Sequence, residues 1–161
     1  MGQLEITQEY LDKLIITPKR IVKKPKKDYL IKNGSRRRDF QVYSDKYKES
    51  FRVFIRQSEA LAECFSIGLQ LLNPLFDEAP ILFRCNGPHG GNDRIKEHFV
   101  THIHRCKLEV LDDMLFSIEK TIEPTDAYTT FDSAIYYFLT MCNILDAKQY
   151  FERSWNVTLF E

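Results

Sequence analysis

From Asp39 to Leu108, apolar residues alternate with polar ones in short runs, and this period of two constrains the fold more than any other feature of the chain. Successive side chains of a β-strand point to opposite faces of a sheet, so the pattern predicts strands. Five strands are expected, near residues 40–43, 51–56, 64–72, 81–85 and 99–108. Their short connections leave no room for the crossover helices that parallel neighbours need. The strands should therefore form one antiparallel meander.

On both sides of this region, apolar residues recur at the spacing of an α-helix. Residues 131–145 carry a broad apolar face, which predicts a helix that covers one face of the sheet. Apolar spacing over residues 5–16, with Thr7 or Gln8 near the start and Pro18 after the end, predicts a short amphipathic helix. The predicted fold is therefore α+β, with two layers.

Three other segments have less definite patterns. Residues 110–118 fit either a helix or a lengthened strand followed by a turn. Residues 146–153 either extend the preceding helix or begin another, and residues 157–160 are apolar enough for a last short strand.

Charge is distributed unevenly along the chain. The sequence has 23 basic and 23 acidic residues, and this balance argues against a protein devoted to coating nucleic acid or membrane. However, basic residues crowd into residues 13–38, whereas the segment after Leu108 is rich in Asp and Glu. Such asymmetry could steer a polyanion to one end of the molecule, or let two copies meet head to tail as a homodimer.

The basic region suggests a division of the chain at residue 38. We expect residues 1–38 to form the first helix and a basic, loosely held arm, and residues 39–161 to form a single α+β domain. Arg36, Arg37 and Arg38 are the candidate polyanion contacts of this arm. A plain solvated linker is the commoner meaning of such a basic run.

Four widely spaced cysteines indicate the compartment. They form no Cys-x-x-Cys pair, no secretory segment precedes them, and no apolar run approaches the roughly 18 residues of a membrane span. These features predict a reduced, cytoplasmic protein that does not enter a membrane, with buried free thiols. Pairing of the cysteines in an oxidising compartment is the alternative.

All four histidines lie within residues 81–105, beside Arg84. This stretch is expected to form a hairpin with a long Gly-rich connection. Alternation places His98, His102 and His104 on one face of its second strand. Since histidine exchanges a proton near neutral pH, the cluster predicts a functional site on the open face of the sheet. The alternative is an edge strand that exposes polar residues to solvent.

The connection could fold back over the second strand and bring His89 to the other histidines. Its Asn86-Gly87-Pro88 run sets the direction of the turn, and Gly90-Gly91 lets the backbone approach a bound group. The candidate catalytic residues are His89, His102, His104 and Arg84. The candidate binding residues are Asn86, Gly87, Gly90, Gly91, Lys107, Arg36, Arg37 and Arg38.

These motifs resemble those of a family of small uncharacterised bacterial and prophage proteins. The family's pattern is an R-x-D/N-G-x-x-H turn, an H-x-H strand and an F-x-x-C-N-I helix end. This chain has Arg-Cys-Asn-Gly-Pro-His at residues 84–89, His-Ile-His at residues 102–104 and Phe-Leu-Thr-Met-Cys-Asn-Ile at residues 138–144, so its turn is one residue shorter and its helix end one residue longer than the pattern. The family usually has Asn-Pro-Asp-Gly after the first histidine, whereas this chain has Gly-Gly-Asn-Asp, and Cys85-Asn86 stands where an acidic residue often lies. The resemblance implies a bacterial setting near toxin–antitoxin or phage-defence genes. It does not imply a particular reaction.

Three functions fit the cluster. The first is a toxin-like or defence-related endoribonuclease that needs no metal and no cofactor. In it, one imidazole takes the 2′-hydroxyl proton, a second protonates the leaving 5′-oxygen, and Arg84 or Lys107 neutralises the charge on phosphorus.

The second function is a transition-metal site formed by His102 and His104 with His98 or His89, to which Asp93 could add an oxygen ligand. The third is a non-catalytic binding protein, such as an antitoxin or anti-defence factor, that docks a partner protein encoded nearby or a nucleic acid. The chain has no G-x-G-x-x-G, P-loop or G-x-S-x-G motif, so it lacks the signatures of dinucleotide-binding proteins, P-loop NTPases and α/β-hydrolases.

Overall fold

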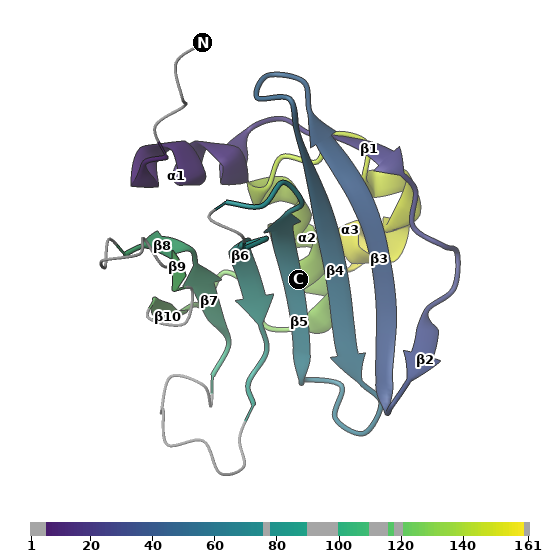
Figure 1. Cartoon of the computed structure of the whole chain (residues 1–161). Helices are drawn as coiled ribbons and strands as arrows, with labels where there is room; N and C mark the ends of the chain where they lie inside the picture. The colour runs from purple at the N-terminus through teal and green to yellow at the C-terminus, as the bar shows by residue number, and fades with distance from the viewer. Residues whose placement is uncertain (1–5, 76–77, 90–99, 110–115, 118–120, 160–161) are drawn as a thin grey trace.

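The computed structural model describes residues 6–75, 78–89, 100–109, 116–117 and 121–159 (Figure 1). Its centre is an antiparallel sheet in which neighbours along the chain are neighbours in space. The five central strands are β3 (Ser35–Ser44), β4 (Glu49–Ser58), β5 (Phe65–Leu71), β6 (Ile81–Asn86) and β7 (His102–Arg105). The predicted antiparallel meander is confirmed.

The sheet extends further than the sequence pattern indicated. Strands β1 (Arg20–Lys23) and β2 (Leu30–Lys32) both pair with β3, and β10 (Ile122–Pro124) pairs with β7. The expected strand at residues 99–108 is divided after Arg105: β8 (Lys107–Leu108) pairs with β9 (Phe116–Ser117) in a separate small sheet. At the division, the Cys106 N–H donates to the Leu82 carbonyl oxygen at 2.9 Å.

Helix α2 (Phe131–Met141) lies against β5 and β6 on one face of the sheet, as predicted (Figure 1). A capping box begins it, because the Thr130 hydroxyl accepts from the Ser133 N–H at 3.1 Å and the Ser133 hydroxyl accepts from the Thr130 N–H at 3.0 Å. The buried Phe138 ring stacks on Phe83, with the ring centroids 5.9 Å apart. This helix and the sheet form the two layers of an α+β fold.

The other helices complete the apolar layer. Helix α1 (Gln8–Ile16) is capped by the Thr7 hydroxyl and buries Leu11, Leu14 and Ile15. After α2, a short 3-10 helix η2 (Lys148–Tyr150) leads into α3 (Glu152–Leu159). The strand expected at residues 157–160 is therefore wrong, because α3 continues through Leu159. A run of four residues with three apolar side chains fits a helical turn as readily as a strand, and α3 packs against α2.

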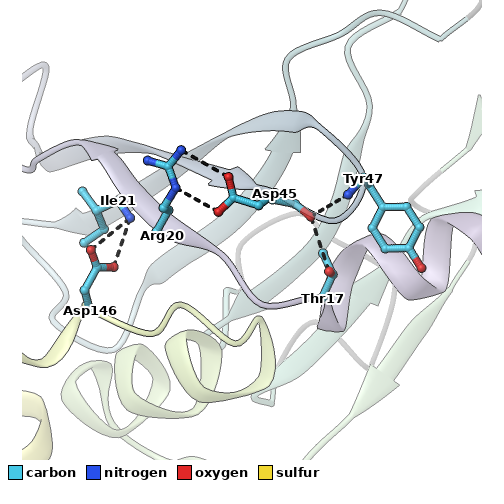
Figure 2. Close-up of polar contacts among 7 residues, drawn as sticks. Thr17, Arg20, Ile21, Asp45, Tyr47 and Asp146 are labelled. Carbon is cyan, nitrogen blue, oxygen red and sulfur yellow. Dashed lines mark hydrogen bonds and ion pairs between the residues drawn. The ribbon is translucent and has the colours of Figure 1, made fainter.

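The expectation of a loosely held arm over residues 19–38 is also wrong. Figure 2 shows how the start of this segment is fixed to the body of the protein. The Ile21 N–H donates to the Asp146 carboxylate at 3.0 Å, and Arg20 pairs with Asp45 at 3.0 Å. Arg36, Arg37 and Arg38 lie within β3, so residue 38 falls inside a central strand. The lysines between the two short edge strands β1 and β2 give the segment the composition of a linker, which explains the misassignment.

Lys19 joins three parts of the chain from a buried position. Its ammonium group donates to the carbonyl oxygens of Ile15 at 2.7 Å, Thr17 at 2.9 Å and Cys142 at 2.8 Å. It therefore satisfies carbonyl groups at the C-terminal ends of both α1 and α2. Burial lowers the pKa of Lys19 to about 8.

Candidate functional site

The face of the sheet turned away from α2 carries a polar row that crosses four strands. Arg56 of β4 pairs with Ser66 of β5, Ser66 pairs with Asn86 of β6, and Asn86 pairs with His102 of β7. Because residues two apart on a strand share a face, Arg84 and His104 form part of a parallel row beside it. The antiparallel register thus brings together polar residues from distant parts of the sequence.

A cavity of about 410 Å³ opens over this row. Among the described residues that line it are two arginines, one histidine and three serines, and none of them carries a carboxylate. We call it the polar cavity. Its lining residues are Gly34, Ser35, Arg56, Gln57, Ser58, Cys64, Phe65, Ser66, Arg84, Asn86 and His89.

The three described histidines converge as predicted, but not on an open face. The ring centroids of His89 and His102 lie 5.0 Å apart, and those of His102 and His104 lie 4.9 Å apart. However, His102 and His104 are only 0% and 1% exposed, so the expectation that they face solvent is wrong. Nor is β7 an exposed edge strand, since β10 covers its far side. Of the three, only His89 lines the polar cavity.

A chain of hydrogen bonds fixes the His102 ring. Its Nδ1 lies 2.8 Å from the Val100 carbonyl oxygen, which can only accept, so the proton is on Nδ1. Its Nε2 is then an acceptor and lies 3.4 Å from the Asn86 amide nitrogen. The Ser66 hydroxyl donates to the Asn86 Oδ1 at 2.8 Å. The contacts of both ring nitrogens therefore hold His102 behind Asn86 and Ser66.

Tyr128 fixes the backbone beneath this chain. Its hydroxyl lies 2.9 Å from the Asn86 carbonyl oxygen and 2.8 Å from that of His102, so one phenol holds β6 and β7 together at the site. Burial raises the pKa of Tyr128 far above its usual value, and the phenol remains a donor throughout the ordinary pH range.

Gly87 directly follows β6, at a position where no side chain would fit. A Cβ atom there would lie 2.0 Å from the Glu63 carbonyl oxygen, and the Gly87 N–H donates to the Phe65 carbonyl oxygen at 3.0 Å. This predicted binding residue thus lets the chain turn tightly towards His89.

Arg56 brings positive charge to one side of the polar cavity. Two nitrogens of its guanidinium bind the two carboxylate oxygens of Asp39, which orients the group but also offsets its charge. Arg84 lies on the adjacent row of the same face and also lines the cavity.

The other predicted site residues have different positions. Lys107 is exposed on β8 and does not line the polar cavity. Arg36 and Arg38 lie over the Tyr29 ring, 4.6 Å and 5.6 Å from its centroid, whereas Arg37 has the opposite parity on β3. Gly90, Gly91, His98 and Asp93 lie outside the described residues. Within the described part of the chain, no group of three or more histidine, cysteine or acidic side chains could hold a metal.

Sequence analysis missed Ser35, Arg56 and Ser66. Ser66 lacks a neighbouring histidine in the sequence, and its link to His102 runs through Asn86 across three strands. Only the strand register shows this link. The alternation on β4 and β5 does place Arg56 and Ser66 on the polar face, so part of the signal was present.

No known protein family, characterised protein or solved structure matches this chain in sequence or fold comparisons. The resemblance to bacterial and prophage proteins therefore stays a prediction. No helix in the described part of the chain has the length and apolar composition of a membrane span.

Proposed function

We propose that this protein binds RNA without cleaving it, and that the polar cavity receives a phosphate group of the RNA chain. The observation that carries the proposal is the set of groups lining the cavity: two guanidiniums, an imidazole and several hydroxyls, without a carboxylate among the described lining residues. Guanidinium groups bind phosphate oxygens in a bidentate manner, and hydroxyls add further donors.

Binding fits this geometry better than catalysis. Cleavage by two imidazoles requires that both reach the same phosphodiester. His102 is fully buried and its two nitrogens face Val100 and Asn86, while His104 is 1% exposed. This leaves His89 as the described histidine that lines the cavity. The Ser66 hydroxyl lines the cavity and keeps its lone pairs while its proton binds Asn86, so it can accept a hydrogen bond from a ribose 2′-hydroxyl, which favours RNA over DNA.

The experiment is calorimetric titration of a uridine trinucleotide at low salt. We expect Arg84→Gln and His89→Ala to weaken binding about tenfold each, because each removes a donor from the cavity. Arg153→Ala is the matched control, since it also removes one guanidinium but its side chain is 86% exposed and lies outside the cavity. Equal affinity of the wild-type protein and both cavity variants would contradict the proposal, as would absence of binding.

RNA cleavage is a second candidate because His89 lies beside the His102 ring and lines the same cavity as Arg84. In that case His89 would exchange the proton and Arg84 would neutralise charge on phosphorus. Incubation of the protein with end-labelled RNA in EDTA distinguishes the two functions. If the wild-type protein cleaves the RNA and the His89→Ala variant does not, the protein is a toxin-like ribonuclease. If the RNA stays intact at saturating protein, the result supports the non-catalytic role.

A further inference from the structure

A second cavity, of about 560 Å³, lies beside the polar cavity. Strands β1 and β2 and the segment between them form one side, and β3 and β4 form the other. Its lining carries eight basic side chains and two carboxylates. We call it the basic groove. Representative basic residues are Lys23, Lys24, Lys26, Lys32, Arg37 and Arg52.

Of the two carboxylates that line the basic groove, that of Asp39 is already engaged by arginines. Arg56 binds the Asp39 carboxylate through two nitrogens, and Arg52 approaches it at 4.0 Å. Arg38 is held in place because its Nε donates to the Lys26 carbonyl oxygen at 2.7 Å. Lys23, Lys24 and Lys26 are exposed, so their ammonium groups are available to a ligand. The basic groove therefore attracts an extended anion.

The basic groove and the polar cavity form one continuous surface. Arg56 lines both of them. Arg37 of β3 pairs with Arg56, which continues the polar row through Ser66 to Asn86. With strands roughly 4.8 Å apart, this row spans about 14 Å, which is longer than a single phosphate group. An anionic ligand that occupies both ends must be a chain with several charged groups.

We propose that the basic groove binds the backbone of the same RNA strand whose phosphate occupies the polar cavity. This inference rests on the proposed function and adds a length requirement to it. The lysines contact phosphates without reading sequence, whereas the polar cavity fixes the position of one phosphate. Short RNA therefore binds in the polar cavity alone, and longer RNA gains affinity from the groove.

The test compares a uridine trinucleotide with a uridine 15-mer over a range of salt concentrations. We expect a Lys23→Ala, Lys24→Ala, Lys26→Ala variant to bind the 15-mer at least tenfold more weakly at low salt. The slope of log affinity against log salt should become shallower by about 2, since each lost phosphate contact removes about 0.7. Trinucleotide affinity should not change.

The matched control replaces Lys13, Lys46 and Lys148 with alanine. These lysines lie outside the basic groove, and their removal lowers the net charge by the same amount as the groove variant does. Equal loss of 15-mer binding in this control would overturn the inference, since net charge alone would then account for the effect. Full 15-mer affinity in the groove variant would overturn it too, while normal trinucleotide binding would leave the proposed function intact. Polyglutamate that displaces the 15-mer at equal charge concentration would also overturn it, and would indicate an acidic protein as the ligand.

Discussion

Gly68 leaves space for an aromatic ring on the polar face of the sheet. It lies between Phe54 and Arg84 in the cross-strand register, and a Cβ atom on it would lie 2.0 Å from the Phe54 Cζ. Phe54 is 8% exposed, and the guanidiniums of Arg52 and Arg56 lie 5.9 Å and 5.6 Å from its ring centroid. The arginines thus rest on an aromatic ring that only glycine permits in this position.

We predict that Gly68→Ala destabilises the protein by about 1–3 kcal/mol, the usual cost of forcing an atom into a packed site. In an ordinary strand the same change is favourable, because glycine weakens strand interiors. Urea unfolding of the wild-type protein, the two single variants and the double variant with Phe54→Ala gives the measurement. The cost of Gly68→Ala should vanish when the ring is absent. Additive costs in this cycle would show that the ring and the glycine do not interact.

At the scale of elements, the central strands and helix α2 were predictable because each carries its own period. β4 alternates apolar with polar residues except at Phe54, and α2 has a wide apolar face. β1 and β2 were not predictable, because strands of four and three residues beside a lysine run have little local signal and are stabilised by pairing with β3.

The site was predictable only in part. Arg84, Asn86 and His89 share one short motif, so sequence reasoning found them. The row that links them to Arg56 and Ser66 depends on the register in which the strands pair. A bulge between Leu69 and Gln70, at the end of β5 away from Ser66, shifts the register of β5 against β6. Burial of His102 depends on tertiary packing, which alternation along one strand does not show.

The start of α2 provides a test of a single element. Thr130→Ala removes the capping hydroxyl and should cost about 1 kcal/mol of unfolding free energy. Thr129→Ala is the matched control, because Thr129 contributes its backbone N–H to Ser133 and its own hydroxyl plays no part in the cap. Urea denaturation should therefore separate the two variants. If they had equal stability, the capping box would contribute nothing to the helix.

At the scale of the whole molecule, buried ionisable groups couple stability to alkaline pH. All four cysteines are free thiols, and three are buried. Burial raises the pKa of Cys106 to about 11 and of Cys142 to about 12, and raises that of Cys85 still more clearly above its usual value. Lys19 has the opposite effect, because burial lowers its pKa to about 8.

The direction in which each group changes stability with pH follows from how many protons the folded and unfolded states bind. Between pH 9 and the raised thiol pKa values, the unfolded chain has lost thiol protons that the folded protein retains, so stability falls as pH rises. Between pH 8 and 10.5 the unfolded chain retains the Lys19 proton that the folded protein releases, so this group raises stability over a window that begins about one pH unit lower. Three thiols oppose one lysine, and the thiols should prevail.

We therefore predict that the unfolding free energy of the wild-type protein rises slightly between pH 8 and 9, where Lys19 acts without the thiols, and declines by several kcal/mol between pH 9 and 10.5, since each pKa unit corresponds to about 1.4 kcal/mol. Urea unfolding at intervals across this range gives the slope. Cys106→Ala should make the decline shallower, because it removes one thiol that lies apart from Lys19. Lys19→Met should make it steeper, because the compensating release of a proton is lost. A decline that neither substitution alters would mean that these two groups do not set the alkaline stability, and it would assign the effect to other groups that ionise in this range.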